Sequence, residues 1–157
     1  MKKIVPLLVL LLAFSSCSRT AKPPALKTEF SQNAVVETGD FSYKAEISMT
    51  DNVVYITATS TNADGLTLSC DSNEVTYSYK GFTDSLPFSQ VSDYNVAKIL
   101  YCVFTDLYNS QVKTDGELTI FNGKVGAGNY ILTLDNNDNL ISLSVDEASL
   151  YINFSND

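Results

Sequence analysis

The chain has 157 residues, of which 18 are acidic and 10 basic, and it contains neither histidine nor tryptophan. The acidic balance disfavours a phosphate- or nucleic-acid-binding role, because such binding depends on Lys and Arg that neutralise phosphate charge. Without histidine, the commonest general base and the commonest zinc ligand are both missing, which argues against a hydrolytic triad and a zinc site. We therefore expect one non-catalytic domain that needs no metal and no cofactor.

The first residues have the three-part layout of a secretory signal. Two lysines precede an apolar run at residues 4–14, which is too short to span a bilayer. The motif Phe14-Ser15-Ser16-Cys17 resembles the lipobox of bacterial lipoproteins, whose cysteine is lipid-modified and becomes the new N-terminus after cleavage. The alternative is an ordinary signal that is cut after Ala13-Phe14-Ser15. We favour the lipoprotein, because two acyl chains on Cys17 would hold the protein on the membrane.

This interpretation divides the chain into three parts. Residues 1–16 are the signal peptide, residues 17–29 are the lipidated cysteine and an extended tether, and residues 30–157 form the domain. The tether contains Lys22-Pro23-Pro24 and little that can pack. The domain would therefore work at the extracytoplasmic face of the cell membrane. Its contact with the membrane would be through the N-terminal lipid, because the acidic surface does not favour docking on anionic lipid.

From about Phe30, short runs alternate between apolar and polar residues, and each run closes at Gly, Asn or Asp. This pattern predicts antiparallel strands joined by turns. Five strands are expected before the first break, at residues 30–36, 41–49, 53–60, 66–70 and 75–79. The alternation is clearest in the second, and it requires a sheet with one buried side and one wet side.

A break is predicted at residues 80–90, and the stretch that follows has helical period. A helix over residues 91–110 would be about 30 Å long, enough to lie across a whole sheet. Ser89 or Ser92 is expected to cap it. Its apolar face contains Val96, Ala97, Leu100, Val103, Phe104 and Leu107, and its polar face contains Asn95, Lys98, Cys102, Asp106 and Asn109.

Four more strands are predicted after Asp115-Gly116. A strand at residues 118–121 is followed by a hairpin turn at Asn122-Gly123 and by a long strand that ends at residue 134. A turn at residues 135–138 leads to a strand at residues 140–145, and the last strand covers residues 150–154. The expected fold class is α+β and mostly β, with about nine strands in one sheet and one long helix.

The order of these elements resembles small LolA-like lipoproteins of the bacterial lipoprotein-carrier superfamily. The stretches most similar to that family are residues 77–81, residues 132–143 and the final strand. The resemblance implies a curved antiparallel half-barrel, with a helix on its concave face and an apolar cavity that holds acyl chains. The soluble carrier of the superfamily is not lipidated and holds its lid with a cavity arginine. The only arginine here is Arg19 in the tether, so the shuttle mechanism is not implied.

A pocket between sheet and helix would be lined mainly by aromatic side chains. The residues expected to line it are Phe41, Tyr43, Tyr77, Tyr79, Ala97, Leu100, Tyr101 and Phe104, and Phe82 and Phe88 are further plausible members. The alternative is an ordinary packed core. Two functions follow: binding of a lipid or acyl chain in the pocket, or binding of another cell-envelope protein through an exposed edge strand or the polar helix face.

Two other motifs are given structural interpretations. Asp135-Asn136-Asn137-Asp138-Asn139 matches the start of a calcium loop, but Leu140 stands where the loop needs glycine, so a hairpin turn is expected. Gly123, Gly126 and Gly128 are expected to mark a turn and a bulge rather than a phosphate-binding loop.

The two remaining cysteines are not expected to form a disulfide. Cys70 alternates with Leu66 and Leu68 and should point into the core, whereas Cys102 falls on the polar side of the helix. Lys98 and Cys102 lie one helical turn apart, a spacing that could lower the thiol pKa. Because no base or orienting partner accompanies them, we interpret them as a plain surface pair.

Overall fold

The computed structural model describes residues 29–60 and 63–155. The predicted signal peptide, Cys17 and the tether up to residue 28 lie outside these ranges. Among the described residues, every helix is too short or too polar to cross a membrane.

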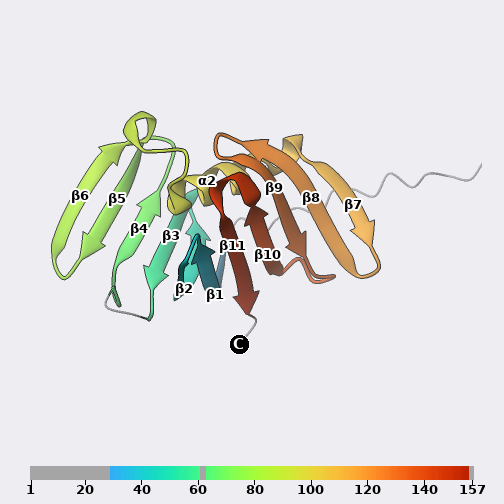
Figure 1. Cartoon of the computed structure of the whole chain (residues 1–157), viewed down its shortest axis with the longest axis horizontal. Helices are drawn as coiled ribbons and strands as arrows, with labels where there is room; N and C mark the ends of the chain where they lie inside the picture. Colours follow the sequence, from blue (N-terminus) through green and yellow to red (C-terminus); the bar gives the residue numbers. More distant parts are fainter. Residues whose placement is uncertain (1–28, 61–62, 156–157) are drawn as a thin grey trace, which may run out of the picture.

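Within the described ranges, eleven antiparallel strands form a single sheet (Figure 1). The strands before the helix are β1 (Phe30–Thr38), β2 (Phe41–Thr50), β3 (Val53–Ala58), β4 (Thr67–Cys70), β5 (Glu74–Tyr79) and β6 (Phe82–Pro87). Those after it are β7 (Gln111–Asp115), β8 (Leu118–Val125), β9 (Gly128–Leu134), β10 (Leu140–Val145) and β11 (Leu150–Ser155). The helix α2 (Val96–Asp106) lies between them, and the 3-10 turns are η1 (Phe88–Gln90), η2 (Leu107–Asn109) and η3 (Asp146–Ala148).

The strand order explains why one helix crosses the molecule. The order is β6-β5-β4-β3-β2-β1-β11-β10-β9-β8-β7, so the first half of the chain winds outwards from β1 to one edge. The second half starts at the opposite edge with β7 and winds back to β11, which pairs with β1. The connection from β6 to β7 must therefore pass over the sheet, and α2 makes this crossing between the two halves (Figure 1).

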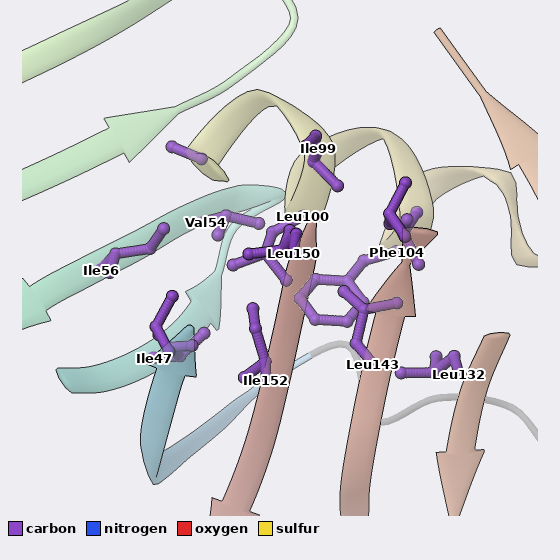
Figure 2. Close-up of a cluster of buried hydrophobic side chains, with 14 of the residues drawn as sticks. Ile47, Val54, Ile56, Ile99, Leu100, Phe104, Leu132, Leu143, Leu150 and Ile152 are labelled. Carbon is purple, nitrogen blue, oxygen red and sulfur yellow. The ribbon is translucent and has the colours of Figure 1, made fainter. Parts of the chain in front are cut away.

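Alternation along the strands places the core on the side of the sheet that faces α2. In β2, Ala45, Ile47 and Met49 are buried, whereas Lys44 and Glu46 are exposed. From α2, Leu100 and Phe104 point towards strands of both halves, with Ile47 and Val54 from the first half and Leu143 and Ile152 from the second (Figure 2). The predicted fold class, a mostly β protein with one sheet and one helix packed on it, is confirmed.

The number of strands was predicted too low. The predicted break contains β6, which pairs with β5 through a tight turn in which Lys80 and Gly81 both have positive φ, at 48° and 85°. The short stretch between the predicted helix, which ends at residue 110, and the predicted turn at Asp115-Gly116 contains β7. Every residue of both edge strands is exposed. Neither strand therefore needs the apolar alternation by which a half-buried strand is recognised.

The helix is shorter than predicted. It covers 11 residues, or about 16 Å, instead of the whole of residues 91–110. Asn95 caps it, because the Asn95 side chain accepts a hydrogen bond from the Lys98 amide at 3.1 Å. The expected cap Ser92 instead accepts a hydrogen bond from the Tyr94 amide in the turn before the helix.

One predicted turn is wrong and one is confirmed. Asn122-Gly123 lies inside β8, where Gly123 is the cross-strand partner of Tyr130, and the chain turns at residues 126–127 instead. The turn after Leu134 is as predicted, with Leu134 paired to Leu140. Asp135 Oδ1 accepts hydrogen bonds from the amides of Asn137 and Asn139 at 2.8 and 2.9 Å, so this carboxylate closes the turn.

Candidate functional site on the helix-facing side of the sheet

The residues predicted to line a pocket all come from the helix-facing side of the sheet or from α2. Cross-strand partners point to the same side. Tyr43 pairs with buried Val36, and Tyr77 pairs with Leu68, which packs against the core. Phe41 is two residues from Tyr43, and Tyr79 is two residues from Tyr77, so each faces the same side of the sheet as its neighbour. The structure divides the predicted set into a packed group, an open group and two tyrosines that contact the segment before the helix.

The packed group lies on α2. Ala97 and Leu100 have no exposed surface, and Phe104 is 6 % exposed. The Phe104 ring meets the Phe30 ring edge to face, with centroids 5.3 Å apart. Because such edge-to-face pairs are favourable and these side chains are withdrawn from water, this part of the predicted site contributes to the hydrophobic core.

The open group lies on the sheet beyond the helix. Phe41 is 55 % exposed and packs against half-buried Tyr43, with ring centroids 5.7 Å apart. Tyr79 is half-buried, and its cross-strand partner Phe82 is 82 % exposed. We call these two pairs, Phe41 and Tyr43 on β2 and Tyr79 and Phe82 on β5 and β6, the open aromatic surface; β3 and β4 lie between the pairs. Its rings lie on the side that forms the core elsewhere, yet they are accessible to a ligand.

Tyr77 and Tyr101 connect the sheet and the helix to the segment that leads into the helix, residues 88–95, which we call the strap. The Tyr77 hydroxyl accepts a hydrogen bond from the side-chain amide of Asn95 at 2.9 Å. Tyr101 meets Phe88 edge to face, with ring centroids 5.7 Å apart. Both tyrosines therefore have positioning contacts to the strap.

Lys98 does not lie on a solvated helix face as predicted. It is 7 % exposed, and its ammonium donates to the carbonyls of Phe88 at 3.1 Å and Val91 at 2.8 Å. It also forms an ion pair with Asp93 at 2.8 Å. Helical periodicity predicts an exposed Lys98, and this prediction is wrong because the strap folds over the side chain. The strap supplies oxygen partners that the periodicity of the helix cannot reveal.

The two cysteines of the described ranges are free thiols. Cys70 is buried as predicted, and burial, with a smaller effect of nearby Cys102, raises its pKa to about 12. Cys102 is half-buried rather than fully solvated, and burial raises its pKa despite the opposing effect of Lys98. Because the thiolate is the nucleophile, neither thiol is activated for chemistry.

In the described part of the chain, no group of three or more Cys, Asp or Glu side chains is placed to hold a metal ion. A pocket of about 250 Å³ lies at the start of β1 and is lined by Glu29, Phe30, Ser31, Gln32, Asp138, Asn139 and Leu140. The Gln32 side chain spans part of it and bonds the Leu140 backbone through both its oxygen and its nitrogen.

Among the comparisons with known proteins, only those with solved structures find a similarity, and it concerns the fold. No protein-family model and no curated protein matches the chain. The structure is similar to that of an uncharacterised conserved protein from Thermus thermophilus, with a TM-score of 0.51 and 9 % identity, over 83 % of this chain and 77 % of that one.

Two further solved structures are similar at lower scores. One is a structure of the complex between the CwlD amidase from Clostridioides difficile and the GerS lipoprotein. The matched chain of that complex has a TM-score of 0.46 and 10 % identity, over 92 % of this chain and 87 % of the matched chain. The other is the LolA superfamily protein NE2245 from Nitrosomonas europaea, with a TM-score of 0.39 and 12 % identity, over 74 % of this chain and 63 % of that one.

Proposed function

We propose that this protein is a non-catalytic, lipid-anchored protein of the extracytoplasmic membrane face that binds a lipid or acyl chain on the helix-facing side of its sheet. The observation that carries the proposal is the open aromatic surface, where Phe41 is 55 % and Phe82 is 82 % exposed. Exposed apolar patches on soluble domains commonly mark sites of ligand or partner binding. The anchor rests on the Phe14-Ser15-Ser16-Cys17 motif.

The predicted set supplies both the contacts and the border of this site. Phe41, Tyr43, Tyr77 and Tyr79 would contact the ligand, joined by Phe82 at the outer end. The helix residues Ala97, Leu100, Tyr101 and Phe104 would form the adjoining wall. Tyrosine suits this role, because its ring offers apolar area to a chain while its hydroxyl stays hydrogen-bonded to water or protein.

Binding is tested by titrating the purified protein with an uncharged fluorescent acyl-chain analogue. The double variant Phe41→Ser/Phe82→Ser should weaken binding by at least about tenfold, since burying a Phe side chain is worth roughly 1.5–3 kcal/mol. Tyr151→Ser is the matched control, because Tyr151 is 43 % exposed but alternates with buried Leu150 and Ile152 and so faces the opposite side. Equal binding by the parent and the double variant would show that the open aromatic surface does not bind the acyl chain.

The depth of the site is tested separately with Ala97→Trp. Because Ala97 is fully buried, the larger side chain should overpack the core and destabilise the protein by about 1–3 kcal/mol or more. Unchanged stability together with lost ligand binding would instead place the acyl chain between helix and sheet, in space that is already open. Thermal denaturation with and without the fluorescent probe distinguishes these outcomes.

The anchor is tested with Cys17→Ala. The variant should lose metabolic labelling with radioactive palmitate and leave the membrane fraction, because Cys17 is the residue placed to carry the acyl chains. Retention of the variant in the membrane fraction would contradict lipid anchoring while leaving ligand binding untouched.

A second candidate function is that of a module that binds another cell-envelope protein. The observation that favours it is that the edge strands β6 and β7 are exposed along their whole length. A free edge presents backbone groups to which another strand can pair. Native mass spectrometry separates the two functions: co-purifying lipid supports the ligand-binding protein, and a lipid-free mass with a captured envelope protein supports the module.

A further inference from the structure

We propose that the ligand of the open aromatic surface is a lipid with a positively charged head, and not a fatty acid or an anionic phospholipid. This inference rests on the proposed function and adds a charge preference to it. It follows from the charges that surround the aromatic rings and from a cation that already occupies one of them.

Charge is divided unevenly along the chain. All 18 acidic residues lie at or after Glu29, whereas half of the 10 basic residues precede it. The domain therefore has five lysines, at positions 44, 80, 98, 113 and 124. Lys98 is buried against Asp93 and two carbonyls, and Lys44 alternates with Tyr43 and Ala45 and so faces the outer side of the sheet. A field of this sign attracts cations and repels anions.

Carboxylates stand beside the open aromatic surface itself. Asp84 is the cross-strand partner of Tyr77 and is two residues from Phe82, so it shares the helix-facing side with both. It is exposed, and its Oδ1 accepts a hydrogen bond from the Ser85 amide at 3.0 Å. Asp40 directly precedes Phe41 in the turn between β1 and β2. A ligand carboxylate or phosphate at this surface would meet charges of its own sign.

Lys80 places a cation against one of these rings. Its ammonium lies 4.9 Å from the centroid of the Tyr79 ring, within the range of about 6 Å at which a cation is attracted to an aromatic face. Lys80 is therefore an internal competitor for the ring that a cationic head would occupy. A ligand ammonium that takes its place keeps the same contact and gains the attraction of Asp84.

Two charge changes give opposite expectations for a cationic ligand. Lys80→Asn should strengthen binding about twofold to fivefold, because it frees the Tyr79 ring and removes a repelling charge. Asparagine is chosen because Lys80 has a φ of 48°, a conformation that Asn tolerates. Asp84→Asn should weaken binding by a similar factor. The matched controls on the outer side, Lys44→Gln and Glu37→Gln, should change it less than either.

The experiment titrates the purified protein with three amphiphiles that share a twelve-carbon chain, below their micelle concentrations: dodecyltrimethylammonium, dodecyl maltoside and dodecanoate. The cationic probe should bind most tightly and dodecanoate most weakly, and added salt should narrow the difference. Dodecanoate binding as tightly as the cationic probe would overturn the charge preference and leave the proposed function standing. Equal effects of Asp84→Asn and Glu37→Gln would likewise overturn it, and binding of none of the three probes would overturn both.

Discussion

The ring of Tyr130 on β9 lies against the backbone of Gly123, its cross-strand partner on β8. A Cβ built on Gly123 would come within 2.5 Å of the ring carbon Cζ and of the hydroxyl oxygen. Tyr130 is only 1 % exposed, so the ring is held by the core around it. The Tyr130 ring therefore occupies the space that a side chain at position 123 would need. Glycine in a strand commonly allows such a close approach to the backbone.

Gly123→Ala should consequently destabilise the protein by about 1–3 kcal/mol, the usual cost of overpacking a closed site. Urea denaturation of parent and variant measures it. In a Tyr130→Ala background the same substitution should cost much less, because the clashing ring is gone. An equal cost in both backgrounds would mean that the alanine acts through the backbone and not through Tyr130.

The same pair shows how far local sequence can predict this fold. Asn-Gly between two apolar runs predicts a hairpin turn. In the structure Asn122-Gly123 instead lies inside β8, where the Tyr130 ring of β9 packs against Gly123. Strands that bury one face, such as β2 with Ala45, Ile47 and Met49, are predicted well because burial imposes a period of two. The edge strands β6 and β7 bury neither face, so they lack that pattern.

The sequence predicts which residues belong to the candidate site, but not which of them are buried and which are exposed. Helical periodicity places Leu100 and Phe104 on the apolar face, and both are buried. The same periodicity places Lys98 opposite, yet Lys98 is buried too, because the strap covers that side. Which aromatic rings stay exposed, such as Phe41 and Phe82, depends on how far the helix reaches over the sheet. That distance is a property of the packed structure and not of any local pattern.

Leu100 is a direct test of the helix as part of the core. It has no exposed surface and points towards both halves of the sheet (Figure 2). Leu100→Ala should cost about 2–5 kcal/mol, the sum of lost apolar transfer and the cavity that remains. Chemical denaturation gives the free energy. Tyr108→Ala, at a position 94 % exposed in the turn after the helix, should change stability by less than about 0.5 kcal/mol. Similar costs at the two positions would contradict the packing of α2.

Lys98 fixes the strap to the helix. Lys98→Met keeps much of the apolar stem but leaves the carbonyls of Phe88 and Val91 without their charged donor. Because hydrogen bonds to charged groups are worth about 1.5–3 kcal/mol, a loss in that range is expected. Asp93→Asn should cost less than about 1 kcal/mol, since the Asp93 side chain is 55 % exposed and screened by water.

Hydrogen exchange of the strap amides measures whether Lys98 holds the strap locally, which global stability does not report. The amides of residues 88–95 should lose protection in Lys98→Met while those of β10 and β11 keep it. Lys113→Met, in the exposed strand β7, is the matched removal of a lysine charge and should leave the strap unchanged. Strap protection equal to that of the parent would show that Lys98 does not hold this segment.

Asp71 provides a pH-dependent contribution to stability. Its Oδ1 accepts hydrogen bonds from the amides of Asn73 at 2.6 Å and Glu74 at 2.9 Å, and these bonds hold the pKa of the carboxyl below its ordinary value. A carboxyl whose pKa is lower in the folded state stabilises the fold above the unfolded pKa, and this stabilisation is lost as the pH falls through the folded pKa. The contribution should therefore be complete at neutral pH and disappear in the acid range below about pH 4.

Asp71→Asn isolates this contribution, because it removes the charge and keeps one acceptor oxygen for the turn. The variant should have a lower Tm than the parent at pH 7, and the difference should shrink as the pH falls below the ordinary range of an aspartate. Asp115→Asn, an equal charge change in the exposed strand β7, corrects for the effect of net charge on an acidic domain. A difference in Tm between parent and Asp71→Asn that stays constant from neutral pH into the acid range, after this correction, would show that the turn is stabilised by the acceptor geometry alone and not by the charge.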